Sequence, residues 1–275
     1  MSIRFTKMQG AGNDFVVIDG ISQRLQLRPR DIRRLADRRR GVGCDQVLLV
    51  EPPGRPDADF RYRVFNADGS EAAQCGNGAR CFARFVHQRR LSNRRQLLLE
   101  AGDRVLRVEL CSGGELLVDL GAPRFEPAQI PLQRPEQALE YRLRVGDREL
   151  RIGALSLGNP HAVVAVDNVD SGIVEALGPA LTAHPDFPQQ VNAGFMQVLD
   201  RERIRLRVHE RGAGETPACG SGACAAVIHG QRMGWLAQRV TVDLPGGKLA
   251  VDWTGEGGVR LGGPAAICFE GSIRL

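Results

Sequence analysis

The feature that most constrains this chain is an internal repeat that spans most of its length. The stretch Gly12-Asn13-Asp14-Phe15-Val16-Val17-Ile18 is matched by Gly158-Asn159-Pro160-His161-Ala162-Val163-Val164, 146 positions later. A second match, displaced by 144 positions, relates two longer stretches further along: Asp68-Gly69-Ser70-Glu71-Ala72-Ala73-Gln74-Cys75-Gly76-Asn77-Gly78-Ala79 and Gly212-Ala213-Gly214-Glu215-Thr216-Pro217-Ala218-Cys219-Gly220-Ser221-Gly222-Ala223. Two matches in the same order and with nearly the same offset indicate a duplicated domain.

The two copies share one order of predicted elements. An early apolar strand (15–19 and 162–166) precedes a short helix (29–39 and 172–181), and alternating strands such as 61–65 and 203–208 follow. A second helix follows each repeated cysteine, over 79–90 in the first copy and 223–233 in the second. Strand-rich halves that each wrap one apolar helix predict an α+β fold. The boundary is expected near Gly121-Ala122-Pro123, where turn residues interrupt the strand pattern.

Composition argues against several classes of partner. The net charge of +5 comes from arginine, with Lys7 and Lys248 as the only lysines, and the arginines are spread through the predicted elements. Aromatic residues make up 5% of the chain, so we expect no stacking platform for nucleic acid. No run approaches 18 apolar residues and the N-terminus has no apolar signal core. We therefore expect a cytoplasmic protein without a membrane partner.

Seven cysteines are present, and their pattern favours single thiols over bridges or metal sites. An odd number without a leader argues against a disulfide framework, and the lack of a C-x-x-C pair argues against zinc. Neither lysine stands in a pyridoxal phosphate context, and the glycines lack the Walker lysine and the dinucleotide-binding order. We therefore expect no metal and no cofactor. The cysteines that we interpret as packing residues are Cys44, Cys81, Cys111, Cys224 and Cys268.

The remaining two cysteines each stand directly before a Gly-x-Gly at a helix start, in Cys75-Gly76-Asn77-Gly78 and Cys219-Gly220-Ser221-Gly222. Glycine removes the side chains that would keep a ligand away from the first-turn amides. Those amides have no partner within the helix, and together with the helix dipole they form an anion site that suits a carboxylate. The same positive end favours thiolate over thiol. One such motif is more often a tight turn with a buried thiol, but two at equivalent places predict a functional pair.

A small amino acid between two such motifs would have its carboxylate between two helix N-termini and its α-carbon between two sulfurs. One thiolate could then remove a proton from one face while a thiol returns a proton to the other. Helix dipoles at about 0.3–1 kcal/mol each do not close the acidity gap between an α-proton and a thiol. Preorganised amides in a water-excluded cleft contribute more, about a few kcal/mol per donor. We therefore expect domain closure to expel water.

These residues resemble the diaminopimelate epimerases along essentially the whole chain. The resembling stretches run from Phe5-Thr6-Lys7-Met8-Gln9-Gly10-Ala11-Gly12-Asn13-Asp14-Phe15 to Gly262-Gly263-Pro264, and include Gly41-Val42-Gly43-Cys44-Asp45-Gln46, Phe65-Asn66-Ala67-Asp68-Gly69-Ser70 and Glu210-Arg211-Gly212-Ala213-Gly214-Glu215-Thr216. The resemblance implies cofactor-independent interconversion of LL- and meso-2,6-diaminopimelate, on the bacterial route to lysine and peptidoglycan precursors, and a homodimer. It also implies two pseudo-symmetric halves, 1–120 plus 263–275 and 121–262, each a mostly antiparallel β barrel around a central helix.

Carried over residue by residue, the resemblance assigns the two bases to Cys75 and Cys219, with the first as donor and the second as acceptor in the LL-to-meso direction. His161 and Glu210 match positions that adjust the cysteine pKa values. The residues assigned to the substrate are Asn13, Gln46, Asn66, Gly76, Asn77, Asn159, Asn192, Glu210, Arg211, Gly220 and Ser221. The amides of residues 76, 77, 220 and 221 are expected to hold the reacting carboxylate, Arg211 the distal carboxylate and Glu210 the ammonium.

Taken singly, most of these residues have an ordinary structural explanation. Glu210-Arg211 alone would be a surface ion pair and His161 a core histidine, and the residues that would be turn residues are Asn13, Asn66 and Asn159. Two positions depart from the family. Ser221 stands where threonine is common, and Phe269 stands where a tyrosine linked to dimer contacts is frequent.

Three rival functions remain at this point. A proline or hydroxyproline epimerase of the same architecture acts on a ligand without a distal zwitterion, so Glu210 and Arg211 would have no role. A non-catalytic small-molecule-binding member would exchange no substrate α-hydrogen with solvent. A thiol redox protein would use the two cysteines as a disulfide.

Overall fold

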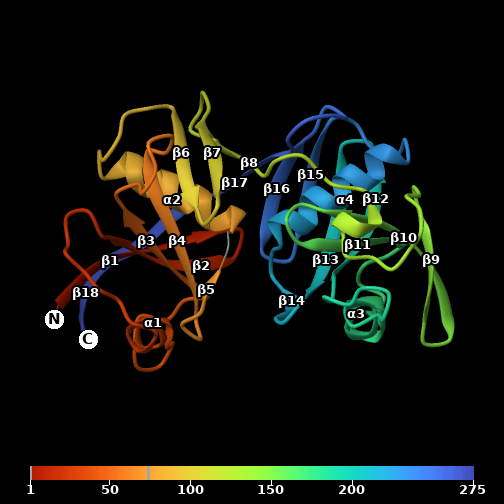
Figure 1. Cartoon of the computed structure of the whole chain (residues 1–275), viewed down its shortest axis with the longest axis horizontal. Coiled ribbons are helices and arrows are strands. Elements are labelled where there is room, and N and C mark those ends of the chain that lie inside the picture. The colour runs from red at the N-terminus through yellow and green to blue at the C-terminus, as the bar shows by residue number, and fades with distance from the viewer. Residues whose placement is uncertain (1, 73–74) are drawn as a thin grey trace. The chain divides into compact units, whose positions relative to one another are not determined.

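The structure is a computed structural model that describes residues 2–72 and 75–275 (Figure 1). The chain divides into two compact units. The first runs to Asp119 and resumes at Gly262, and the second spans Leu120–Leu261. These limits differ by one residue from the expected 1–120 plus 263–275 and 121–262, and the interpretation of the two units as epimerase halves stays a prediction.

The first unit contains two outer strands that come from opposite ends of the chain. β1 lies beside β18, with Phe5 opposite Gly271, and the two strands are antiparallel. The elements of this unit are β1 (Ser2–Gly10), β2 (Asn13–Asp19), α1 (Pro29–Ala36), β3 (Gln46–Glu51), β4 (Phe60–Asn66), β5 (Glu71–Ala72), α2 (Gly76–Gln88), β6 (Gln96–Ala101), β7 (Arg104–Leu110), β8 (Leu116–Asp119) and β18 (Ala266–Arg274).

The second unit repeats this order with an added hairpin at its start, in which β9 and β10 are antiparallel. Its elements are the 3-10 helix η1 (Pro127–Gln129), β9 (Tyr141–Val145), β10 (Arg148–Ser156), β11 (Pro160–Ala165), α3 (Ile173–Thr182), β12 (Asn192–Asp200), β13 (Arg203–Glu210), β14 (Gly214–Thr216), α4 (Gly220–Arg232), β15 (Arg239–Leu244) and β16 (Gly247–Asp252). The remaining strand, β17 (Arg260–Gly263), runs across the boundary between the units in the chain.

The two units use the same strand register around their cysteine motifs. β2 and β3 are parallel, with Phe15 opposite Gln46, and β11 and β12 are parallel, with His161 opposite Asn192. The pairs β4–β6 and β13–β15 are also parallel, whereas the other described pairs within each unit are antiparallel. Mixed sheets with helices confirm the predicted α+β fold class. The register itself shows that the sequence repeat is a structural repeat.

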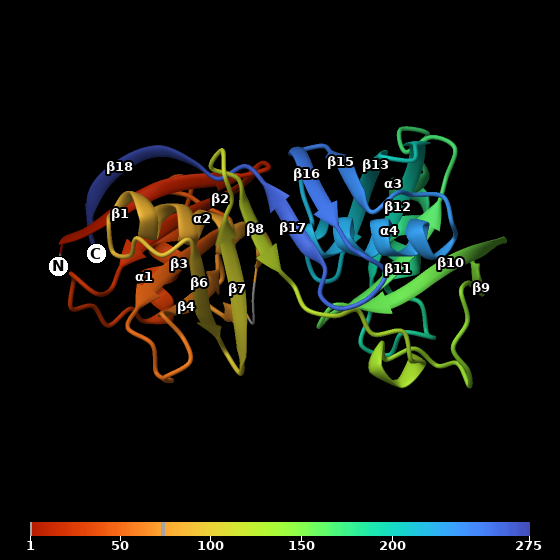
Figure 2. The same ribbon diagram turned by 90° about the horizontal axis from the view of Figure 1, so that it is seen from above.

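One helix in each unit is packed inside the strands (Figures 1 and 2). α2 contacts β1, β2, β3, β4, β7 and β8, and α4 contacts β10, β11, β12, β13 and β16. Residues 77–83 of α2 and residues 222–230 of α4 are all buried. In α4 this burial involves small side chains, Ala223, Ala225 and Ala226, which let the surrounding strands approach at close-packed density.

Both central helices begin three residues earlier than the sequence pattern predicts, at Gly76 and Gly220. Hydrophobic periodicity does not register a first turn made of glycine and polar residues. Cys75 and Cys219 have extended backbone conformations at the N-cap positions. The Gly-x-Gly of each motif is therefore the first helical turn, and its amides are the ones without carbonyl partners in the helix.

The outer helices cover a second apolar core in each unit. In the first unit, Ile32 and Leu35 of α1 pack in a cluster with Val16 and Val47. In the second unit, the side chains of α3 pack in a cluster with strands β9 to β12. Among the described residues, no helix has both the length and the apolar character that crossing a membrane requires.

The cysteines outside the motifs differ in burial. The expectation of packing residues holds for Cys44, Cys81 and Cys224, which are buried. Cys111 is half-buried, and the expectation is wrong for Cys268, which is exposed. Cys268 lies on β18, where most residues are exposed, so its apolar character alone does not bury it.

Candidate active site

The first half of the candidate site is built at the start of α2. The Cys75 Sγ accepts a hydrogen bond from the Gly78 amide at 3.4 Å, so the thiol group itself caps the helix. On the other side of the residue, the Tyr62 hydroxyl donates to the Cys75 carbonyl at 2.9 Å. Tyr62 is buried on β4, and its contact fixes the backbone of Cys75. An amide that donates to sulfur stabilises thiolate relative to thiol.

Gly78 is required for this arrangement. A Cβ at position 78 would lie 2.4 Å from the Tyr62 hydroxyl oxygen and 3.4 Å from the Cys75 Cβ. The tyrosine can therefore approach the helix only where the helix has no side chain. Tyr62 was not among the predicted site residues, because its contact crosses from a strand to a helix and leaves no pattern in the sequence.

Asn13 lies next to the thiol of Cys75. Its Oδ1 is 3.7 Å from the Cys75 Sγ, and its Nδ2 donates to Asp45 at 2.8 Å. Asp45 also accepts from Arg38, and Arg38 donates to both carboxylate oxygens of Asp14. The sequence motifs contain these residues, but the ion pairs between them were not predicted. They hold the turn that contains Asn13 against the start of β3.

A buried lysine completes this network. Lys7 contacts Asp14 at 2.5 Å and also donates to the Gly43 carbonyl. Burial raises the pKa of Asp14, but hydrogen bonds from Arg38 and Lys7 outweigh it, so the pKa lies well below the ordinary value. Asp14 is therefore ionised at neutral pH.

Gln46 and Asn66, two further predicted residues, contact each other. They are opposite on the antiparallel pair β3–β4, and the Gln46 Nε2 donates to the Asn66 Oδ1 at 3.0 Å. Asn66 in turn donates to the Ser70 hydroxyl at 3.1 Å. The first half thus holds its predicted amide side chains in defined orientations.

The second half of the candidate site is built at the start of α4. Cys219 is 5% exposed, and its thiol donates to the Glu210 Oε2 at an S···O distance of 3.1 Å. The Thr216 hydroxyl donates to the other carboxylate oxygen of Glu210. Burial, followed by the charge of Glu210, raises the pKa of Cys219 well above its ordinary value. Cys219 is therefore a protonated thiol in this state.

Thr216 was missed as a site residue, although it lies in the quoted motif. Its hydroxyl fixes the Glu210 carboxylate so that the second oxygen faces the thiol. The signal that could have identified it is its place in β14, which pairs with β13 next to Glu210. The repeat offset of 144 positions makes Asn66 the equivalent of Glu210 in the first unit. Asn66 is neutral, whereas Glu210 is an acid.

His161, Asn159 and Ser221 form a chain of hydrogen bonds that ends at Cys219. The His161 Nε2 is 3.1 Å from the Asn159 Oδ1, and the Asn159 Nδ2 donates to the Ser221 hydroxyl at 3.3 Å. The Ser221 Oγ is 3.7 Å from the Cys219 Sγ. Since the amide oxygen only accepts, Nε2 of His161 carries its proton. Burial, followed by the charge of Arg211, lowers the pKa of His161 to about 3, so the ring is neutral.

Asn192 and Arg211 meet at the edge of the second half. The Asn192 Oδ1 accepts from the Arg211 amide at 2.9 Å. The Arg211 guanidinium donates to the Gln189 carbonyl at 3.0 Å, and the side chain is exposed. Asn192 is 4% exposed, so its side-chain amide supports the fold in addition to any contact with a ligand.

Gly222 has the same role in α4 that Gly78 has in α2. A Cβ at position 222 would lie 3.2 Å from both the Cβ and the Sγ of Cys219 and 3.1 Å from Val208. The second glycine of each motif therefore leaves room for a close neighbour, which is Tyr62 in the first unit and Cys219 in the second.

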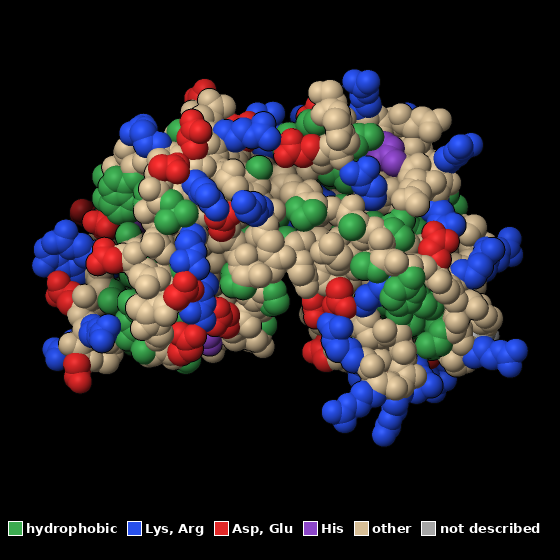
Figure 3. Space-filling model, turned by 180° about the vertical axis from the view of Figure 1, so that it is seen from behind, with side chains coloured by type: hydrophobic (Ala, Val, Ile, Leu, Met, Phe, Trp, Pro, Cys, Tyr) green, Lys and Arg blue, Asp and Glu red, His purple; other side chains and the backbone are tan. Residues whose placement is uncertain are grey.

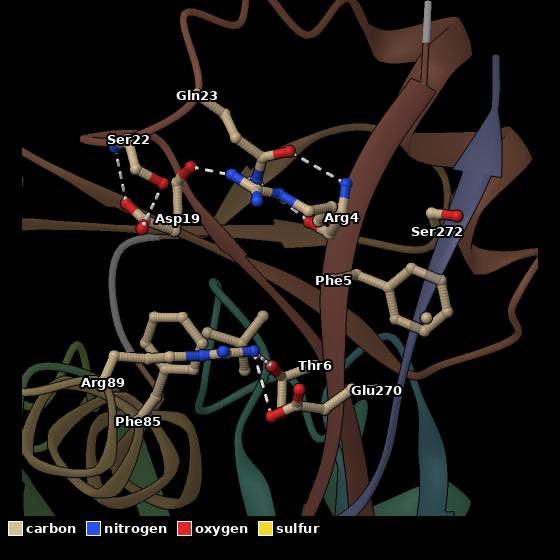
Figure 4. A pocket seen from close by; sticks show the side chains of 12 residues that line it. Arg4, Phe5, Thr6, Asp19, Ser22, Gln23, Phe85, Arg89, Glu270 and Ser272 are labelled. Atoms are coloured by element: carbon tan, nitrogen blue, oxygen red, sulfur yellow. Dashed lines mark hydrogen bonds and ion pairs between the residues drawn. The ribbon is translucent and has the colours of Figure 1, made fainter.

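A separate pocket of about 560 Å³ lies in the first unit (Figure 4). It is lined by residues of β1, β2, α2 and β18, among them Arg4, Asp19, Arg89 and Glu270. Arg89 pairs with Glu270 at 2.9 Å and donates to Thr6 at 3.2 Å. None of the predicted site residues lines this pocket. The pocket therefore gives no information about the chemistry of the two cysteines.

Charged side chains of both signs lie on the surface. Figure 3 shows Lys and Arg side chains interspersed with Asp and Glu over much of one face. Several are in ion pairs, such as Arg207 with Glu175 and Glu215 at 2.6 Å. The expectation that the arginines do not form a nucleic-acid site stays a prediction.

Comparison with known proteins identifies the family of this chain. The family model described as "Diaminopimelate epimerase" matches residues 5–126 and 153–267. Proteins named diaminopimelate epimerase from Ectopseudomonas mendocina and Alkalilimnicola ehrlichii are 55% and 56% identical, each over 100% of both chains.

Among solved structures, the fold is shared with a hydroxyproline epimerase from Agrobacterium vitis, with a TM-score of 0.70 at 15% identity over 99% of this chain and 92% of that one. It is also shared with a PhzF-family protein from Bacillus anthracis, with a TM-score of 0.68 at 17% identity over 100% of both chains. At such identities these two structures establish the fold alone. The full-length matches at more than half identity establish more: the chain belongs to the diaminopimelate epimerase family.

Proposed function

We propose that Cys75 and Cys219 are the two bases with which this epimerase interconverts LL- and meso-2,6-diaminopimelate in lysine biosynthesis. The observation that carries the proposal is that both cysteines occupy the N-cap position of a central helix, each directly before a first turn that contains Gly-x-Gly. Family membership supports the reaction, and the geometry of each half supports the assignment of the bases.

The proton transfers balance between the two sulfurs. In the LL-to-meso direction, the Cys219 thiolate takes the α-proton and becomes a thiol, leaving a carbanion at the α-carbon. The Cys75 thiol gives its proton to the opposite face of that carbon and becomes a thiolate. The reverse reaction exchanges the two roles. Substrate α-hydrogen is therefore lost to one sulfur and replaced from the other, which exchanges with solvent.

The first-turn amides are the proposed binding site of the reacting carboxylate. The amides of Gly76 and Asn77 in α2, and of Gly220 and Ser221 in α4, belong to the donors that a helix leaves without carbonyl partners. Donors aimed at the charge that develops next to the α-carbon lower the barrier, typically by about 3–4 kcal/mol each.

The other predicted residues are proposed to orient the substrate. Asn13 and Ser221 lie next to the two sulfurs, at 3.7 Å in each case. We propose that Arg211 binds the distal carboxylate, because its guanidinium is exposed next to the edge of the second half-site. The remaining proposed substrate contacts are Gln46, Asn66, Asn159, Asn192 and Glu210.

Glu210 is proposed chiefly as the group that sets the state of Cys219. One carboxylate oxygen faces the thiol and the other is held by Thr216. In this position the carboxylate can also take the thiol proton before Cys219 acts as a base. His161 reaches Cys219 only through Asn159 and Ser221, so its effect on the pKa of Cys219 is indirect.

We further propose that two copies of the chain form a homodimer through β18. Phe269 on this strand is 51% exposed and packs edge-on against Phe5 of β1, with ring centroids 6.1 Å apart. An exposed aromatic residue on a largely exposed strand is the kind of surface that a second copy covers. Light scattering of Phe269→Asp against the parent chain tests this, and a parent that is monomeric at micromolar concentration would contradict it.

The function is tested by incubating reduced protein with LL-diaminopimelate in heavy water with a chelator. We expect deuterium at one α-carbon of the meso product, and loss of both product and exchange in Cys75→Ala and Cys219→Ala. Cys81→Ala and Cys224→Ala are matched controls, because these cysteines are buried on the same two helices. Full activity of either motif variant would refute the two-base assignment. Turnover of proline or hydroxyproline in place of diaminopimelate would refute the substrate.

A further inference from the structure

Arg80 is a charged side chain at the centre of the first unit. It lies one turn after Cys75 in α2, it is 0% exposed, and it is the largest fully buried side chain in the described structure. A guanidinium stays protonated in proteins, so its charge is buried with it. Burying a cation costs several kcal/mol unless other groups compensate it. A buried arginine at the base of the candidate anion site therefore calls for an explanation.

The contacts of Arg80 are directed at the first turn of its own helix. Its Nη2 donates to the Asn77 Oδ1 at 2.7 Å, and its Nη1 donates to the Gly76 carbonyl at 3.4 Å. Gly76 and Asn77 are the residues whose amides are proposed to bind the reacting carboxylate. The guanidinium thus holds the side chain of Asn77 and the carbonyl of Gly76 in this turn.

The charge of Arg80 reaches the neighbours of Cys75. Burial raises the pKa of Cys81 to about 12, and the charge of Arg80 opposes that rise. Burial also raises the pKa of Tyr62 well above its ordinary value, and Arg80 again acts in the opposite direction. Both groups are therefore neutral at pH 7. The titratable and charged groups around this part of the helix are Tyr62 from β4, Cys75, Cys81 and Arg84 from α2 and its cap, and Cys268 from β18.

The second unit has no counterpart of this charge. The position equivalent to Arg80 in the repeat is Cys224, which is buried and 144 positions later. Cys219 instead faces the carboxylate of Glu210 at 3.1 Å. The two cysteines therefore have neighbours of opposite charge, the buried Arg80 in the first unit and the half-buried Glu210 in the second, although the backbones around them repeat.

We propose that Arg80 is a positioning residue that holds Cys75 as the thiolate of the resting enzyme and shapes the first turn of α2 for the substrate carboxylate. This rests on the proposed function of Cys75. In the resting state Cys75 is then a thiolate and Cys219 a thiol. This resting state starts the meso-to-LL direction directly. For the LL-to-meso direction, Cys219 must first lose its proton, which the adjacent Glu210 carboxylate can accept, and Cys75 must take a proton from solvent. The turnover then returns the enzyme to the resting state, because Cys75 has given a proton and Cys219 has received one.

The test measures alkylation of each cysteine by iodoacetamide as a function of pH, read from the two peptides by mass spectrometry. In the parent enzyme we expect Cys75 to alkylate with a lower pH midpoint than Cys219, and equal midpoints would overturn the proposal without any variant. In Arg80→Met, the rate at Cys75 is expected to fall about tenfold or more at pH 7, which corresponds to a shift of about one pH unit. The midpoint of Cys219 should not move.

Two further variants separate charge from folding. Arg80→Lys keeps the charge and loses the two-pronged hydrogen bonding, so the midpoint of Cys75 should stay near that of the parent while KM for diaminopimelate rises. Arg84→Met, one turn later on α2, is the matched control and should leave both midpoints unchanged. A folded Arg80→Met with the parent midpoint would mean that the residue is purely structural. Because alkylation needs no turnover, this result is independent of whether Cys75→Ala abolishes epimerisation.

Discussion

The close approach of Tyr62 to α2 gives a sharp prediction for Gly78→Ala. The new Cβ would lie 2.4 Å from the Tyr62 hydroxyl oxygen, closer than any real contact, so the ring or the helix must move. Tyr62 is 2% exposed and packs edge-on against Phe82, with ring centroids 5.1 Å apart, so it has little space to retreat. The movement breaks the 2.9 Å hydrogen bond from the hydroxyl to the Cys75 carbonyl.

The expected cost follows from three contributions. Overpacking of a tight core costs about 1–3 kcal/mol. Breaking a buried hydrogen bond and leaving its partners unsatisfied costs about 1–3 kcal/mol. Replacing a helical glycine by alanine returns up to about 1 kcal/mol. The net loss of unfolding free energy is therefore about 1–6 kcal/mol. Displacement of the Cys75 backbone should lower kcat by about 100-fold.

A double-mutant cycle with Tyr62→Phe isolates the clash. The phenylalanine lacks the oxygen that the new Cβ meets, so in its presence Gly78→Ala should cost at least 1 kcal/mol less, about the size of couplings between residues in contact. Urea unfolding of the parent, the two single variants and the double variant gives the cycle. Gly222→Ala is the matched substitution in the second unit, where the closest contacts are 3.1–3.2 Å, and it should destabilise less. Additive costs in the cycle would refute the steric argument.

Three further predictions concern charge and redox state. Burial and the Glu210 charge both raise the pKa of Cys219, so Glu210→Gln should lower the pH midpoint of its alkylation, and an unchanged midpoint would contradict the contact. The pKa of Asp14 is lowered on folding, so its stabilisation is present above the ordinary value of 3.8 and is lost as the pH falls below it. Asp14→Asn should therefore lower the urea midpoint by more at pH 7 than near pH 2, whereas an equal difference at both would contradict the linkage. Diamide should inactivate the enzyme reversibly with a Cys75–Cys219 disulfide in the peptide map, and inactivation without that peptide would argue against two thiols at one substrate.

Much of this architecture could be predicted from the repeat in the sequence. The offset of 146 relates Phe15 to His161 and Gln46 to Asn192, and the structure pairs Phe15 with Gln46 in the same way as it pairs His161 with Asn192. Repeated motifs identify equivalent backbone positions, because a duplicated domain keeps its topology while its side chains change. The start of each central helix was harder to predict, since a glycine-rich first turn carries no hydrophobic period.

The supporting contacts of the two half-sites could not be predicted. Thr216 holds Glu210 from a neighbouring strand, and Tyr62 reaches Cys75 from β4 across the gap left by Gly78. Both contacts depend on which side chains meet between elements that are distant in sequence. Arg80 is adjacent to the motif, yet composition suggested an exposed arginine, since arginines are almost never fully buried. Only the packing of α2 inside its strands shows that this charge is buried.

A two-base reaction requires one thiolate and one thiol at the same moment, and duplication alone does not provide this. Two identical half-sites would share a single proton equally, so at most about half of the molecules would carry it on a given cysteine. Neighbours of opposite charge separate the two titrations and make one protonation state dominant over the pH range between them. Two pairs of equivalent positions are therefore the important differences between the halves. Asn66 in the first unit corresponds to Glu210 in the second, and Arg80 in the first corresponds to Cys224 in the second. On the proposed mechanism, the repeat supplies two equal anion sites, and these four positions make their cysteines unequal.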